Sequence, residues 1–244
     1  SGADLTGALL QEADLSEADF TEAALNKANL EGARLKESCF ERASLQECVL
    51  RAVDGSEAVF IEADLSRSDL QQGNFCGADF SFSILEEATF QGARLQEASL
   101  EGARGRGINM QDTDLTELRA SEGCNLSQGK FQKAKGRESI WEEAVLTGAD
   151  FSYADLEGAD FSNASLQASI FSFASLKGAR FMKADLEKAV LRQANLFAGS
   201  FEKANLEAAD LRGSNLYGVE FLKANLKRAR LEEANLKSTK LLGV

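Results

Sequence analysis

Residues 3–30 read ADLTG-ALLQE-ADLSE-ADFTE-AALNK-ANL, a run in which Leu or Phe recurs at every fifth position. A small residue, usually Ala, stands two positions before each of these Leu or Phe residues. A period of five fits neither the 3.6-residue period of a helix nor the two-residue period of a strand, so neither element would place this apolar set on one face. The fixed internal period therefore decides the fold, because it indicates an array of stacked repeats.

The repeat continues along the whole chain in two registers. The first covers residues 3–115, one extra residue falls within 116–125, and the second covers 126–241. Phe residues also recur at intervals of twenty in each register: Phe20, Phe40, Phe60 and Phe80, then Phe161, Phe181, Phe201 and Phe221. Four pentads predict a coil with four similar sides, in which residues twenty apart lie directly above one another. We interpret residues 1–244 as one solenoid of about twelve such coils.

Tandem repeats of the form A(D/N)LXX over residues 3–241 resemble those of the pentapeptide-repeat proteins. The resemblance implies an all-β fold, a right-handed quadrilateral β-helix, with the Leu or Phe and the small residue pointing inward. Each coil of such a fold pairs with the coils above and below, so Pro would remove a backbone donor, and the chain has no Pro. Because side chains fill the interior, we expect partners to bind the outer faces, the ends or an interruption of the repeat.

The composition argues against an enzyme. The chain has no His, which excludes His-based catalysis and zinc sites that need imidazole. It has no phosphate-binding loop, metalloprotease motif or nucleophile motif, so we expect no catalytic residue, no cofactor and no metal. The net charge of −12 argues against direct binding to nucleic acid or to an anionic membrane. The four cysteines form no CxxC pair, which predicts that all four are free thiols in a reducing compartment. We therefore expect a cytoplasmic location, with the alternative that the chain is a domain of a larger or exported protein.

Negative charge is concentrated in the first half of the chain. Residues 1–122 carry a net charge of −14 and residues 123–244 carry +2. One side of the coil repeats Glu two positions after its central residue, at Glu17, Glu37, Glu57, Glu97 and Glu117. Two interpretations stand: these carboxylates keep an edge-rich rod soluble, or they bind a partner through a charge density close to that of duplex DNA.

The interruption of the repeat, within residues 102–141, is a second candidate surface. Basic residues gather near it, among them Arg104, Arg106, Arg119 and Arg137. Two interpretations stand here as well: a tolerated defect where two repeat arrays join, or a basic collar that binds an acidic partner surface. At the C-terminal end, the apolar Leu241, Leu242 and Val244 are candidates for an end-to-end contact in a weak homodimer.

These patterns predict a non-catalytic structural and protein-interaction module, a rigid acidic rod that presents its outer faces to a protein partner. The family resemblance implies an alternative, because some pentapeptide-repeat proteins are DNA mimics that bind a type II topoisomerase such as gyrase and protect it from inhibitors. The sequence departs from that subgroup, since it has no long inserted loop and no C-terminal helix of the kind that joins those proteins into dimers. The identity of the partner is left open by the sequence.

Overall fold

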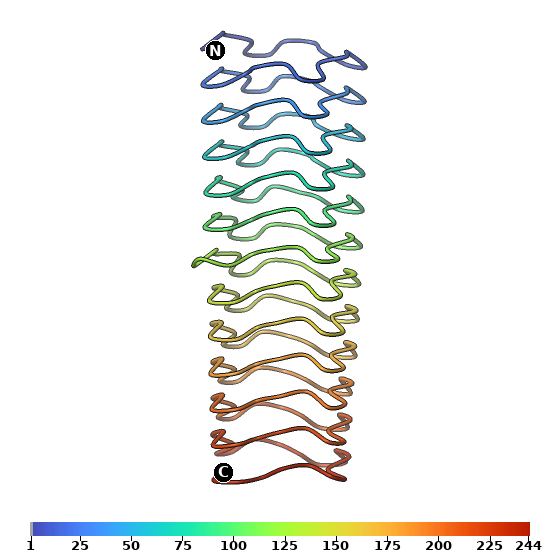
Figure 1. Cartoon of the computed structure of the whole chain (residues 1–244), viewed down its shortest axis with the longest axis vertical. Helices are drawn as coiled ribbons and strands as arrows, with labels where there is room; N and C mark the ends of the chain where they lie inside the picture. Colours follow the sequence, from blue (N-terminus) through green and yellow to red (C-terminus); the bar gives the residue numbers. More distant parts are fainter. Residues whose placement is uncertain (1) are drawn as a thin grey trace.

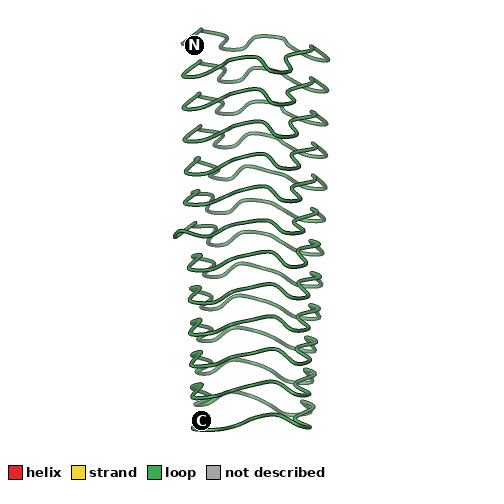
Figure 2. Cartoon of the chain, in the orientation of Figure 1, coloured by secondary structure: helices red, strands yellow, loops and turns green. Residues whose placement is uncertain are grey.

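The computed structural model describes residues 2–244 as a straight rod of stacked coils (Figure 1). Residues 2–244 contain no helix and no strand longer than one residue (Figure 2), so the β-structure consists of single-residue parallel bridges. In the first coil these bridges join Asp4 to Ala24, Leu9 to Asn29, Asp14 to Arg34 and Asp19 to Cys39. Each of these four bridges spans twenty residues, which is the four-sided coil of a β-helix. We number the sides 1 to 4 from these four bridges.

Every pentad uses its five residues in the same way. Going along the chain, they are the small inner residue, the bridge residue, the central residue, and the first and second turn residues; in pentad 149–153 these are Ala149, Asp150, Phe151, Ser152 and Tyr153. In this pentad the N–H groups of the bridge, central and second turn residues donate to carbonyls of neighbouring coils at 2.7–3.0 Å. The small inner residue donates to the preceding central residue and closes a turn. The last N–H, of Ser152, donates to Oδ1 of Asp150 at 2.8 Å. All five backbone donors of this pentad are therefore satisfied, and Pro would remove a ladder or turn donor at four of its five positions.

The turns have a left-handed residue at their second position throughout. The φ angles at this position lie between +51° and +73°, and most of the residues that adopt them are not glycine. A positive φ at this place is the signature of a type II turn. The same geometry at each corner makes the four sides equivalent.

The coil lengthens by one residue at a single corner. The bridge from Ser99 reaches Arg119, twenty residues on, but the bridge from Arg104 reaches Asn125, twenty-one residues on. In the turn 121–124 both central residues have positive φ, +51° at Glu122 and +72° at Gly123. The extra residue is therefore absorbed by a type I′ turn in place of a type II turn. Figure 1 shows the coil bulging outward there, in the green part of the rod.

Central side chains fill the axis of the rod. Phe rings one coil apart lie face to face, with centroids 5.0 Å apart for Phe40 and Phe60 and 4.7 Å apart for Phe60 and Phe80. Where glycine takes the central position, a neighbour occupies the space: a Cβ on Gly55 would lie 2.9 Å from the ring of Phe75. The buried indole of Trp141 donates to Ser139 Oγ at 2.7 Å. The interior is thus filled with side chains, and any binding site must lie on the outside.

Candidate interaction surfaces

The described part of the chain, residues 2–244, holds no group of three or more His, Cys, Asp or Glu side chains that could bind a metal ion. No helix within it has the length and apolar character needed to cross a membrane. The outer surface has open depressions, among them one of about 510 Å³ near Gly77 and one of about 620 Å³ near Gly213. The surfaces of the rod are therefore the candidates for function.

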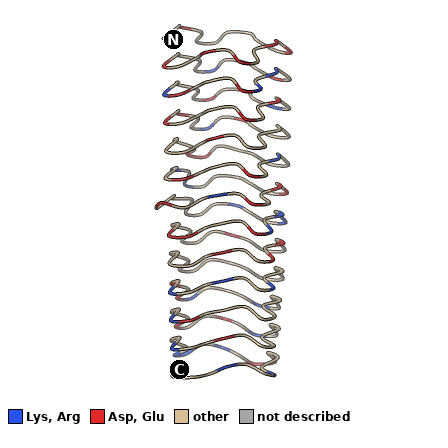
Figure 3. Cartoon of the chain, viewed as in Figure 1, with Lys and Arg blue, Asp and Glu red and all other residues tan. Residues whose placement is uncertain are grey.

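The predicted glutamates lie together in one column. All are exposed second turn residues at the corner after side 3: Glu17, Glu37, Glu57, Glu97 and Glu117. Gly77 interrupts the column, and its missing side chain leaves the hollow of about 510 Å³ between Glu57 and Glu97. Beyond the enlarged corner Glu138 follows, and the column then becomes almost bare, with Gly158, Gly178, Ala198 and Gly218. Figure 3 shows the matching trend, with acidic residues frequent in the N-terminal coils and basic residues more frequent toward the C-terminus.

The four predicted arginines are exposed but do not form one patch. Arg104 and Arg106 lie on side 1, Arg119 lies on side 4, and Arg137 lies on side 3. Arg106 donates to Gln128 Oε1 at 3.2 Å, and Arg137 donates to Asp155 Oδ2 at 2.8 Å. The Asp155 carboxylate raises the pKa of the Arg137 guanidinium. These cations surround the rod as a collar, and only Arg104 and Arg106 share a side.

The cysteines offer no reactive site in the core. All four are free, and Cys48 and Cys124 are buried at small inner positions. Burial raises the pKa of the Cys48 thiol to about 11 and that of Cys124 to about 12. At neutral pH both are protonated and act as small apolar side chains.

The last coil exposes the predicted apolar residues. Leu242 is 72% exposed, and Leu241 and Val244 are also exposed. The central residues of this coil, such as Leu226 and Leu231, are only partly buried.

The structure also has two exposed columns of stacked aromatic side chains that were not predicted from the sequence. Tyr153 and Phe173 stack with centroids 4.9 Å apart at the corner between sides 2 and 3. Phe197 and Tyr217 stack with centroids 5.6 Å apart as first turn residues of side 3. The sequence held the signal, since FSYAD, FSFAS, LFAGS and LYGVE each place an aromatic residue at an outward position. Both columns lie in the C-terminal half and frame side 3.

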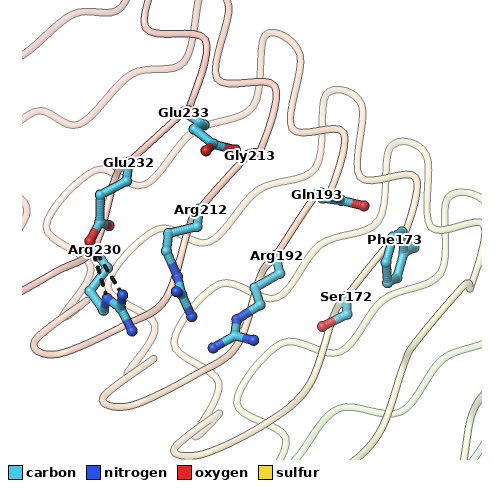
Figure 4. A pocket seen from close by; sticks show the side chains of 9 residues that line it. All are labelled: Ser172, Phe173, Arg192, Gln193, Arg212, Gly213, Arg230, Glu232 and Glu233. Atoms are coloured by element: carbon cyan, nitrogen blue, oxygen red, sulfur yellow. Dashed lines mark hydrogen bonds and ion pairs between the residues drawn. The ribbon is translucent and has the colours of Figure 1, made fainter.

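A network of arginines lies beside the first aromatic column. Asp210, only 8% exposed, accepts hydrogen bonds from Arg192 at 2.6 Å and from Arg212 at 2.7 Å. The two guanidinium groups hold the pKa of this carboxyl far below its usual range, with the Arg212 hydrogen bond as the largest cause. Both arginines line the hollow of about 620 Å³, together with Phe173, Gln193 and Gly213 (Figure 4). Gly213 provides no side chain, so the corner is open there.

Comparisons with known proteins address the family. The family model described as pentapeptide repeat region matches residues 25–100, and the model described as pentapeptide repeats matches residues 1–37, 124–163, 159–196 and 200–241. No curated protein matches the chain.

Several solved structures are similar. HetL, a pentapeptide repeat protein involved in heterocyst differentiation regulation in the cyanobacterium Nostoc, is 31% identical, with 97% of this chain and 90% of that chain covered and a TM-score of 0.39. Full-length QnrB1, a plasmid-mediated fluoroquinolone resistance protein, is 19% identical over 76% of this chain and 90% of that chain, with a TM-score of 0.32. A protein of the Arabidopsis thaliana thylakoid lumen is 24% identical over 50% of this chain and 68% of that chain, with a TM-score of 0.30. The family models cover well over half of a chain that repeats one pentad along its length, and this chain belongs to the pentapeptide-repeat family.

Proposed function

We propose that this chain is a non-catalytic protein-interaction module, a right-handed quadrilateral rod of about twelve coils that binds a protein partner through its acidic outer surface. The observation that carries the proposal is the exposed column formed by Glu17, Glu37, Glu57, Glu97 and Glu117. The four free cysteines support a reducing compartment such as the cytoplasm for the rod, or for a larger or exported protein of which it is a domain.

The glutamate column does not serve the fold. Carboxylates one coil apart, at about 4.8 Å, repel each other by somewhat under 1 kcal/mol per pair in water. Each glutamate also has a positive φ, between +57° and +59°, a conformation that costs a non-glycine residue about 1 kcal/mol. Glycine would remove both penalties, as it does at Gly77. Glutamate at five such positions therefore favours a role in binding.

The chemistry of the column specifies a basic partner. The hollow at Gly77 separates Glu57 from Glu97 and leaves room for a Lys or Arg side chain between two carboxylates. Arg94 and Gln96 also line this hollow, so a cationic side chain that enters it would contact cationic and neutral polar groups as well as the two carboxylates. A row of cationic side chains spaced by one or two coils would fit this surface.

A DNA mimic that binds a type II topoisomerase such as gyrase is the second candidate. Its support is the charge density of the N-terminal half, where −14 charges over about six coils correspond to one charge per roughly 2 Å, against one per about 1.7 Å in duplex DNA. The C-terminal half has a net charge of +2 and does not continue this profile.

The test uses two triple variants with the same change of charge. Glu37→Lys, Glu57→Lys and Glu97→Lys reverse the column, whereas Glu47→Lys, Glu62→Lys and Glu87→Lys reverse exposed second turn residues on other corners. Association with purified gyrase is measured at several salt concentrations, and supercoiling is assayed with and without an inhibitor. We expect the column variant to associate more slowly and with weaker salt dependence, while the control triple keeps most of the parent rate.

If the parent chain does not bind gyrase, the DNA-mimic candidate fails. If a binding partner associates equally fast with the parent and with the column variant, the column has no role in binding and serves solubility alone.

A further inference from the structure

Side 3 is almost free of charge in three successive coils of the C-terminal half. Over three successive coils it consists of residues 173–178, 193–198 and 213–218, which read FASLKG, QANLFA and GSNLYG and contain one charged residue, Lys177. The same positions in the first three coils, residues 12–17, 32–37 and 52–57, read EADLSE, GARLKE and AVDGSE and contain eight. Loss of charge together with gain of exposed aromatic residues is typical of the centre of a protein interface.

The aromatic residues of this surface are ordered before any partner arrives. Phe197 is 45% exposed and Tyr217 is 36% exposed, and their rings lie within 8° of parallel. Phe173 is stacked on Tyr153 in the same way. Binding therefore costs little side-chain entropy, which favours these residues as anchors.

The surface between the two aromatic columns is neutral and its hydrogen bonds are internal. Asn215 donates to Asn195 at 3.0 Å, and Asn235 donates to Asn215 at 3.0 Å. The adjoining corner presents Gly178, Ala198 and Gly218, which have little or no side chain. A second flat surface can approach closely at this corner, because these positions present little or no side chain.

We propose that this surface binds a second copy of the chain, with the two rods antiparallel and related by a two-fold axis at the level of Phe197. Such an axis pairs a coil of one copy, a given number of coils before Phe197, with the coil of the other copy that lies the same number of coils after Phe197. Phe197 then meets the Phe197 of the other copy. Phe173 lies opposite Gly213, at the hollow of about 620 Å³ that Gly213 leaves open (Figure 4).

Charges support the same register. The axis places Lys237 opposite Glu157, whose carboxylate also lies 3.6 Å from Arg137 Nη2, and it places Lys177 opposite the ring and hydroxyl of Tyr217. Within residues 2–244 neither Lys177 nor Lys237 has an ion-pair partner, so both are available to the other copy. Sliding one rod by one coil, so that Lys177 lies opposite Lys237, would bring like charges together and disfavours that register.

The size of the contact predicts a weak dimer. Five coils at about 4.8 Å and a side about 13 Å wide give roughly 300 Å² per copy, below the roughly 800 Å² of a standard interface. We therefore expect a weak, transient dimer that forms only at high protein concentration. The glutamate column lies in the other half of the rod, so this inference does not depend on its partner.

Sedimentation equilibrium from low to high micromolar protein tests the proposal. Phe197→Asp places two carboxylates against each other on the axis, and we expect at least about a tenfold loss of affinity. Phe82→Asp is the matched control, because Phe82 is 53% exposed and lies at a corner of the N-terminal half. It should associate like the parent. Circular dichroism confirms that each variant keeps the fold of the parent.

A charge exchange tests the register. Lys237→Glu places two carboxylates opposite each other and should weaken association, whereas adding Glu157→Lys should restore it. A strictly monomeric parent overturns the proposal. So does association that Phe197→Asp leaves unchanged, that Phe82→Asp weakens equally, or that the exchanged pair fails to restore.

Discussion

The bridge residue explains why the repeat favours Asp and Asn. The N–H of the first turn residue is the donor of the pentad that no backbone carbonyl accepts, and in many pentads the bridge side chain accepts it, as Asp150 does from Ser152 at 2.8 Å and Asp160 from Ser162 at 2.9 Å. Asn fills this role as well as Asp does, as in the 3.1 Å bond from Ser127 to Asn125. Most of these carboxylates are therefore present for the backbone, and the charge that can be assigned to function is that of the turn residues.

Asp210 is a bridge residue that accepts additional hydrogen bonds, because the guanidinium groups of Arg192 and Arg212 both donate to its carboxylate. We expect Asp210→Asn to lower the free energy of unfolding at pH 7 by about 1–3 kcal/mol, since both guanidinium groups lose a charged partner. The folded pKa of Asp210 is depressed, so its stabilisation is complete above the unfolded value of about 3.9 and is lost as the pH falls through the folded value. The difference in free energy of unfolding between the parent and Asp210→Asn should therefore become smaller below about pH 4.

Urea unfolding at several pH values measures this gap. Asp150→Asn is the control, because Asp150 accepts only from Ser152 and from the neutral Gln132 in the hydrogen bonds that the structure shows. A gap for Asp210→Asn that stays constant down to the lowest accessible pH would contradict the assignment.

At the scale of the pentad, the backbone N–H groups of four positions donate to backbone carbonyls, either between coils or across a turn. The N–H of the fifth position does not. The first turn position is the exception, since its N–H is bonded only where the bridge residue is Asp, Asn or a similar acceptor. Glu142 is the first turn residue of a pentad whose bridge residue, Ile140, has no side-chain acceptor. Within residues 2–244 no backbone carbonyl accepts the N–H of Glu142. This position has the φ that Pro favours in a type II turn.

We therefore expect Glu142→Pro to leave the free energy of unfolding within about 0.5 kcal/mol of the parent, or to raise it by up to about 1 kcal/mol. Ser165→Pro should lower it by more than about 2 kcal/mol, because the N–H of Ser165 donates to the carbonyl of Ala144 at 2.9 Å. Urea unfolding compares the two variants. Equal losses would mean that the positions of the pentad are not distinguished as the hydrogen bonds indicate.

The period also determines what the sequence can predict. Because each coil has a constant length, the spacing of Phe40, Phe60 and Phe80 alone predicts that their rings stack, and they do. The type I′ turn at Glu122 and Gly123 could not be predicted in this way, because an extra residue can be absorbed by several turn geometries. The aromatic columns were missed because Tyr153 and Phe173 are twenty residues apart and become neighbours only when outward positions are also arranged by coil. The pairing of Arg192 and Arg212 with Asp210 depends on side-chain conformations, which a period does not fix.

The whole rod has two halves with different surfaces. The N-terminal half is strongly acidic on its outside, and the C-terminal half has nearly balanced charge and two exposed aromatic columns. Like-charge repulsion keeps the N-terminal halves of two copies apart, so any self-association must use the C-terminal half.

The C-terminal coil offers a contact separate from side 3. Leu241, Leu242 and Val244 are exposed there, whereas the first coil exposes Asp4, Glu12 and Asp14, which repel the same end of another copy. We propose that two rods associate weakly end to end through residues 222–244. Two different symmetric contacts on one chain produce open polymers, so the parent should form species larger than a dimer at high concentration.

Sedimentation of four proteins separates the two contacts. Leu242→Lys, at a residue 72% exposed, should stop growth beyond the side-by-side dimer, and Phe197→Asp should stop growth beyond the end-to-end dimer. The double variant should be monomeric, because the two contacts share no residue and their effects add. If Leu242→Lys leaves the size distribution of the parent unchanged, the apolar end is not a contact. If the double variant still associates, a third surface of the rod must be responsible, and the assignment of self-association to these two surfaces is wrong.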